Sequence, residues 1–246
     1  KRQLQSTEVM AAQDDRWVCC GGRDFVSKRP EETEDDGSLA ELFFVDTSPF
    51  VHKYYKESWA ANSGGILDEK EKTKDKTGAL DVALERSVSP WKIVVGHHPI
   101  RSNGRHGDTP ELLSVLPEIL NRNKADFYFN VSPFNERERE WGWKGLSFVL
   151  PIFWLTPSPP FSSHETGLQG HDHDLQLIAD PSNPGLRYVT SGAGSRTRLE
   201  SFYGDNKVAF HTFSSGFVTV ALSSQQARVQ FWLWDSTLAH ELVAQK

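Results

Sequence analysis

Short apolar runs separated by polar turns dominate the first half of the chain, where they alternate with segments of helical spacing. Apolar runs bounded by turn residues are typical of buried strands, and apolar positions three and four residues apart are typical of helices. The pattern predicts strands at 42–45, 92–95 and 125–130 and helices at 79–86 and 110–121. The second helix follows a threonine and has proline at its first position, which is a usual helix start.

After residue 185 the pattern changes to consecutive strands split by turns rich in glycine and serine. The expected strands are 186–190, 208–212, 217–222 and 227–234, paired antiparallel. Alternation of helices and strands followed by strands alone predicts an α/β fold of the layered α+β kind, with α/β/β layers. Residues 1–17 are interpreted as the end of a helix, and 28–38 and 62–77 as polar surface loops.

The segment 131–169 differs from both of its flanks. It carries three tryptophans and a tract of proline and serine, and it shows no sustained period of either type. Loops of this length without their own secondary structure are uncommon inside a compact domain. The segment begins with valine, whose codons start with GU, and ends with glutamine, one of whose codons is CAG. A spliceosomal intron translated in frame would show these ends, so our hypothesis is that 131–169 is a retained intron. The alternative is a disordered or partly collapsed surface excursion.

Composition and charge exclude several classes of partner. The chain has 246 residues, 37% of them hydrophobic, and a formal net charge of −6. This balance argues against a nucleic-acid partner held by a basic face. No apolar run approaches the roughly 18 residues of a membrane span, so no membrane partner is expected.

The beginning of the chain and its cysteines give weaker indications. The opening residues KRQLQSTEV lack the apolar run of a secretory signal, and the only methionine is Met10. The sequence therefore predicts a processed chain or a fragment. Cys19 and Cys20 are adjacent, which is poor geometry for a disulfide between them, and no disulfide framework is expected.

Histidines supply the candidate chemistry. His97 follows the apolar run 92–95, and His171 and His173 alternate on a turn that begins with glycine. A single histidine at a strand end is more often structural than a ligand. Two imidazoles on one tight turn can point at the same site, however, and with His97 they offer three nitrogen donors suited to zinc, iron or manganese.

Four longer motifs carry a specific resemblance. The segments KIVVGHHPI, GHDHDLQLI with DFYFN before it, YVTSGAGS and ELFFVDTSPF resemble the small, plant-type purple acid phosphatases of the calcineurin-like metallophosphoesterase superfamily. The resemblance covers 1–130 and 170–246 and skips 131–169. It implies that residues 1–246 are a single partial domain, the C-terminal half of an α/β/β/α sandwich, with 131–169 as an insert foreign to the family.

The resemblance also implies an activity and a set of roles. The family hydrolyses phosphomonoesters at a binuclear centre of Fe(III) beside Zn(II), Mn(II) or Fe(II), in which two cations clamp the phosphoryl oxygens. By resemblance, His97 and His171 hold the divalent ion and His173 holds the iron. His106 matches the histidine that contacts the phosphate and helps to protonate the leaving group. Family membership further implies a secreted or cell-wall protein.

The remaining ligands of the family are missing from this sequence. They come from the motifs GDxG, GDxxY and GNH, none of which occurs here. The chain is therefore expected to be the C-terminal part of an acid phosphatase, weakly active or inactive as given. Two alternatives stay open: a catalytically silent module that binds one zinc or iron ion, and a poorly folded fragment.

Neighbours of the histidines are assigned smaller roles. His98 lies beside a candidate ligand, points the other way in an extended chain and precedes a proline, so we expect it to pack or to line the rim. Asp172 and Asp174 are expected to orient imidazoles or face solvent, not to bind metal.

Overall fold

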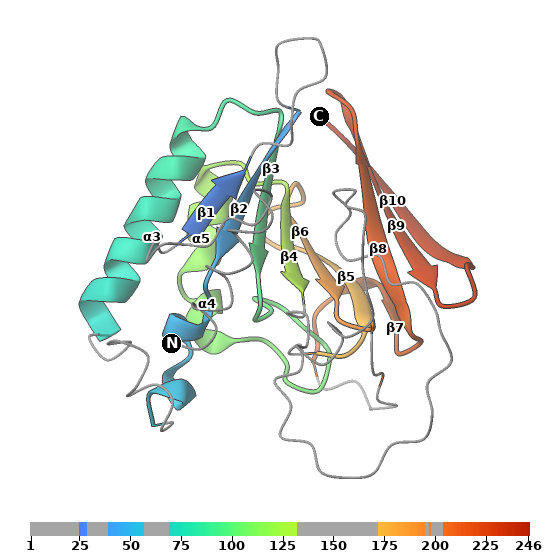
Figure 1. Cartoon of the computed structure of the whole chain (residues 1–246), viewed down its shortest axis with the longest axis horizontal. Coiled ribbons are helices and arrows are strands. Elements are labelled where there is room, and N and C mark those ends of the chain that lie inside the picture. The colour runs from blue at the N-terminus through green and yellow to red at the C-terminus, as the bar shows by residue number, and fades with distance from the viewer. Residues whose placement is uncertain (1–24, 29–38, 57–68, 132–171, 195–196, 198–203) are drawn as a thin grey trace, which may run out of the picture.

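The described part of the chain forms three layers. The computed structural model describes residues 25–28, 39–56, 69–131, 172–194, 197 and 204–246. A seven-stranded sheet lies in the middle, with helices on one face and a three-stranded sheet on the other (Figure 1). This arrangement confirms the predicted layered α/β fold.

Four parallel strands form the centre of the large sheet. In order across the sheet, its strands are β1 (Phe25–Lys28), β2 (Ala40–Val45), β3 (Trp91–Gly96), β4 (Phe127–Val131), β6 (Arg187–Ser191), β5 (Leu175–Ala179) and β7 (Val208–Thr212). Strands β2, β3, β4 and β6 run parallel, and β5 is antiparallel to β6. The carboxyl ends of the four parallel strands therefore share one sheet edge with the amino end of β5, at the bottom of the view in Figure 1.

The other elements cover the two faces of this sheet. The helices are η1 (Ser48–Phe50), η2 (His52–Lys56), α3 (Glu69–Arg86), α4 (Pro110–Leu113) and α5 (Leu116–Arg122), and the second sheet has the antiparallel strands β8 (Gly216–Leu222), β9 (Gln226–Leu233) and β10 (Leu238–Gln245). None of the helices described here is long and apolar enough to cross a membrane.

Alternation along the central strands divides the core in two. In β3, Trp91, Ile93 and Val95 pack in the cluster between the two sheets. Val94 packs in the cluster under the helices. Because successive side chains of a strand point to opposite faces, one strand supplies both clusters. This explains why residues 93–95 of β3 are all apolar and do not alternate with polar residues.

Two helix predictions need correction. Residues 69–77, expected in a surface loop, belong to α3. Their lysines and glutamates show no apolar stripe, but both residue types have high intrinsic helix propensity. The helix expected at 110–121 is divided into α4 and α5 at Ser114 and Val115. Pro117 has no N–H and its ring collides with the carbonyl four residues earlier, so a continuous helix cannot pass through it.

One strand pairing also differs from the expectation. Strand β6 pairs antiparallel with β5 but parallel with β4. The hairpin of β5 and β6 folds back so that β6 lies between β4 and β5, which makes β6 run in the direction of β4. Strands β1, β5 and β10 were not predicted. Val131, the first residue of the expected insert, is the last residue of β4.

The predictions for several segments lie outside the described residues. These segments are 1–17, nearly all of 28–38, and 132–169 within the expected insert. The retained-intron interpretation therefore stays a prediction.

Replacing Gly78 with alanine should stabilise the chain. Gly78 lies within α3 and is exposed, and a Cβ built on it meets nothing within 4 Å. Glycine inside a helix costs about 0.5–1 kcal/mol relative to alanine. We expect Gly78→Ala to raise the free energy of unfolding by about that amount in a urea titration. A decrease would contradict the helical assignment of this position.

Candidate active site

Two of the candidate ligands flank strands that meet at the same sheet edge. His97 directly follows β3, and His173 lies two residues before β5. Strand β4 lies beside β3, and β6 lies between β4 and β5. Ligand sites of parallel α/β sheets form at the carboxyl ends of the strands, which is the edge these two histidines occupy.

The surroundings of His97 favour a neutral imidazole. Its side chain is half-buried, and its Nδ1 lies 3.4 Å from the carbonyl oxygen of Val131 at the end of β4. Because a carbonyl only accepts, this contact favours the tautomer with the proton on Nδ1, in which Nε2 carries the lone pair. Burial lowers the pKa of His97, which favours the neutral form. Neutral imidazole is the form that binds metals.

His98 packs in the interior, which agrees with the role expected for it. It is fully buried, with its Nδ1 2.7 Å from the hydroxyl of Thr47 and its Nε2 2.9 Å from the hydroxyl of Tyr54. Its carbonyl accepts a hydrogen bond of 2.7 Å from Tyr128. Burial raises the pKa of Tyr128, so this hydroxyl stays a donor. These contacts fix the backbone next to His97.

Replacing His98 with phenylalanine should destabilise the chain by about 1–3 kcal/mol, because the buried hydroxyl of Thr47 loses its ring partner. Tyr54→Phe removes only the bond to Nε2, at a partly exposed site, and should cost less. Urea titrations of both variants measure the difference. Equal losses would show that the ring packs without needing its polar contacts.

The loop that carries His106 is bound to the turn that carries His173. Asp172 lies in that turn and is buried. Its carboxylate accepts a hydrogen bond of 3.0 Å from the backbone N–H of His106 and another from the hydroxyl of Ser102. The loop approaches closely at Gly104, where a Cβ would lie 2.5 Å from the Cγ of Asp172. The structure thus brings together two segments that the sequence analysis singled out separately.

Asp174, which follows His173 in the chain, is also held by hydrogen bonds. Its Oδ2 accepts hydrogen bonds of 2.8 Å from the amide of Gln176 and 2.9 Å from Nε2 of His211 on β7. The sequence analysis missed His211 because no motif surrounds it, and an isolated histidine in a strand has no distinguishing pattern. Asp172 and Asp174 therefore hold neighbouring segments. Both are buried, so the alternative that they face solvent is wrong.

The structure gives no site geometry for the other two predicted site residues, His106 and His171. His106 is exposed on the loop between β3 and α4. Its proposed contact with phosphate stays a prediction. His171 lies outside the described residues. The expected convergence of His97 and His171 is therefore not tested.

The described residues do not by themselves fit a binuclear metal centre. Within the ranges that the structure describes, no three or more His, Cys, Asp or Glu side chains are grouped to hold a metal ion. His97 and His173 offer two imidazoles, while both oxygens of Asp172 and one oxygen of Asp174 are engaged in hydrogen bonds. The described donors do not complete a metal site, so we derive no chemical step through a pair of ions.

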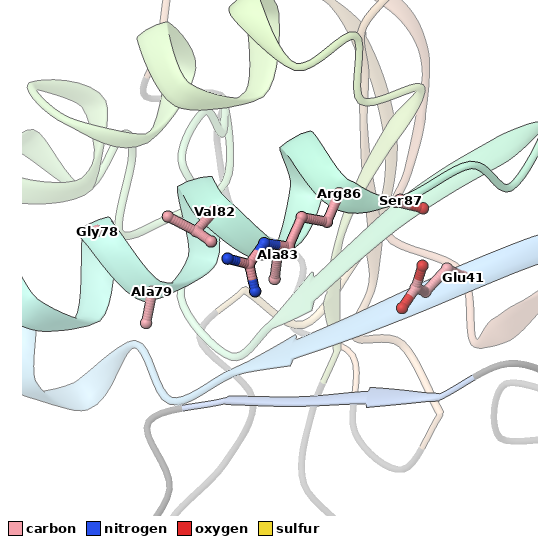
Figure 2. A pocket seen from close by; sticks show the side chains of 7 residues that line it. All are labelled: Glu41, Gly78, Ala79, Val82, Ala83, Arg86 and Ser87. Atoms are coloured by element: carbon pink, nitrogen blue, oxygen red, sulfur yellow. The ribbon is translucent and has the colours of Figure 1, made fainter.

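A hollow of about 550 Å³ has none of the candidate histidines in its lining. Figure 2 shows the residues that line it. It is lined by the last turns of α3 and by Glu41 of β2, with Val82 and Arg86 among the side chains around it. One carboxylate and one guanidinium beside a mainly aliphatic helix face do not make a catalytic cluster. We assign no activity to this hollow.

Comparison with known proteins identifies relatives of the chain. No model of a protein family matches it. Purple acid phosphatase 17 of Arabidopsis thaliana is 31% identical over 262 residues, which cover 99% of this chain and 59% of that protein. Purple acid phosphatase 3 of the same plant is 30% identical over 233 residues, covering 93% of this chain and 50% of that protein. The chain is related to the purple acid phosphatases.

The relationship has a defined extent. The chain spans between half and three fifths of the length of these two purple acid phosphatases. This agrees with the expectation that it corresponds to their C-terminal part. The relatives are phosphatases, and membership of their family implies a binuclear metal centre.

A solved structure supports the fold. One structural match is the protein described as GAP50, the anchor in the inner membrane complex of Plasmodium. The match covers 97% of this chain and 60% of the GAP50 chain, with a TM-score of 0.62. The two sequences are 17% identical. At that identity the likeness concerns the fold alone.

Proposed function

We propose that the chain is the C-terminal part of a metal-dependent acid phosphatase that hydrolyses phosphomonoesters. The observation that carries the proposal is the position of His97 and His173 at one edge of the central sheet, in a chain related to purple acid phosphatases. His97, His171 and His173 are the proposed metal ligands, and the fully assembled site holds Fe(III) with Zn(II), Mn(II) or Fe(II).

His106 is the proposed catalytic residue of this chain. Its loop is bound through Asp172 to the turn that carries Asp172, His173 and Asp174, which we call the histidine turn. The imidazole of His106 therefore lies on a segment held next to the proposed ligand His173. An exposed histidine at such a rim can contact a substrate phosphate and give a proton to the leaving oxygen. The substrate class is a phosphomonoester, and the related plant enzymes favour a secreted or cell-wall location.

A second candidate is a catalytically silent module that binds a single metal ion. It is favoured because no group of three ligand side chains occurs among the described residues. It is also favoured because the chain lacks the motifs GDxG, GDxxY and GNH. In this case the imidazoles hold one ion and no turnover follows.

Zinc titration of the full chain tests the metal site that both candidates share. We expect one Zn(II) to bind, and His97→Ala and His173→Ala each to weaken binding by at least about 10-fold. His52→Ala is the matched control, because His52 is an exposed histidine on η2 with a side chain 70% accessible. Binding that is unchanged in both site variants, or equally weakened in the control, would overturn the proposed ligands.

A further inference from the structure

A buried hydrogen-bond network connects the histidine turn to two other segments. Its central members are Ser102 and Gln176, and Asp172 and Asp174 lie at its two ends. All four side chains are at most 2% exposed. Polar groups this deeply buried usually form hydrogen bonds within the protein or with ordered water, and here most of them bond to one another.

The amide of Gln176 joins the turn that carries His173 to the loop that carries His106. Its Nε2 donates to the hydroxyl of Ser102 at 2.9 Å and to Asp174 at 2.8 Å. Its Oε1 accepts a hydrogen bond of 2.9 Å from the backbone N–H of Asn103. Both amide protons and the carbonyl oxygen are thus engaged. No apolar side chain of this size could replace these contacts.

The hydroxyl of Ser102 is similarly saturated. It donates to Asp172 and accepts from the backbone N–H of Gly104 and from Gln176, both at 2.9 Å. The same carboxylate of Asp172 holds the backbone N–H of His106. The position of the His106 loop therefore depends on Ser102.

His211 anchors the other end of the network. Its side chain is 5% exposed, and its Nε2 lies 2.9 Å from Asp174. Its ring contacts Phe213 edge-on at a centroid distance of 4.4 Å. The second oxygen of Asp174 has no hydrogen-bond partner among the described residues, so the two bonds to Oδ2 are the contacts that orient this carboxylate.

We propose that Ser102, Gln176 and His211 are positioning residues, which through Asp172 and Asp174 hold the turn of His173 and the loop of His106 as one unit. The inference rests on the proposed function, because it gives this unit the task of presenting imidazoles to a metal ion. Both neighbours of His173 in the chain are fixed, so the backbone of His173 is held from both sides. Connected buried networks of this kind rigidify the groups they join.

The test uses the full chain and substitutions that preserve side-chain volume. Gln176→Met removes the amide, and His211→Phe removes the donor to Asp174. His211→Gln keeps an N–H donor near the position of Nε2 and should rescue the loss. His240→Phe is the matched control. His240 lies on β10 of the other sheet, and its ring stacks on Phe210 with a distance of 4.9 Å between the ring centroids.

Two readouts distinguish positioning from general stability. The first is hydrogen exchange of the His106 amide and the imidazole ¹⁵N shifts of His173 in the metal-free chain. The second is the dissociation constant for Zn(II). We expect Gln176→Met and His211→Phe to accelerate that exchange, to move the His173 signals and to weaken zinc binding roughly 10- to 100-fold. His211→Gln should restore most of each, and His240→Phe should change none.

The outcomes separate this inference from the proposed function. Folded variants with the exchange, shifts and zinc affinity of the parent chain would overturn the positioning role. If the parent chain binds no zinc, the proposed metal site is wrong, and exchange at His106 alone decides whether the network positions the loop. Should Gln176→Met not fold, Ser102→Ala removes the next link of the network and takes its place.

Discussion

The chain of 246 residues should hydrolyse an aryl phosphate only at background rate, even with added iron and zinc. The motifs GDxG, GDxxY and GNH are absent from it, and the residues described by the structure form no group of three metal ligands. Without a second ion the attacking and leaving oxygens are not stabilised together. Most of the electrostatic contribution to catalysis is then lost. Steady-state assays at mildly acidic pH measure this.

Turnover should appear when the missing ligands are supplied. The chain would be joined to a segment carrying the three motifs, with 132–169 deleted. Val131 is kept because it ends β4 and its carbonyl oxygen contacts His97. We expect activity to rise by at least about 10³-fold over the chain alone. In that protein His106→Ala should lower turnover more than metal content, because His106 is assigned to the phosphate and not to the metal. Ordinary phosphatase rates from the unextended chain would refute this account of the ligands.

The central strands could be predicted because their physics is local. Strands β3 and β4 are buried on both faces, so each contains a short apolar run, 93–95 and 127–129. The same runs placed His97 correctly at a strand end. A resemblance in four motifs then gave the family, which the plant relatives support.

Other elements could not be predicted because tertiary contacts determine them. The first half of α3 lacks an apolar stripe, and its helical state follows from propensity that a periodicity analysis does not register. The placement of β6 between β4 and β5 depends on the pairing of distant strands. No local pattern encodes that order.

The network around His173 is the least predictable part of the site. Ser102, Gln176 and His211 come from three segments that are separated by up to 109 positions in the sequence. Each has an ordinary local context, and only the folded sheet brings them to the carboxylates beside His173. The sequence indicated the candidate histidines, and the structure adds the contacts that hold the loop of His106 and the two neighbours of His173.

The end of β6 lies so close to the histidine turn that an added methyl group at Gly192 should disturb both stability and zinc binding. Gly192 follows β6, and its backbone N–H donates a 3.0 Å hydrogen bond to the carbonyl of Asp174. A Cβ at this position would lie 1.9 Å from the carbonyl oxygen of Asp172. The obstacle is backbone, so no side-chain rotation can relieve it. Alanine at 192 must push the turn away from the sheet.

Gly192→Ala should therefore lower the free energy of unfolding by about 1–3 kcal/mol, the usual cost of forcing an extra methyl into a packed site. It should also weaken zinc binding by at least about 10-fold, because the displaced turn carries His173. Gly78→Ala is the matched control: the same substitution, made in α3 where the new methyl meets nothing within 4 Å, should stabilise the chain and leave zinc binding unchanged. Urea titration and zinc calorimetry on both variants measure the two effects. Equal stabilities for Gly192→Ala and the parent chain would mean that the histidine turn does not pack against the end of β6 in solution. The inference that the central sheet positions His173 would then be wrong.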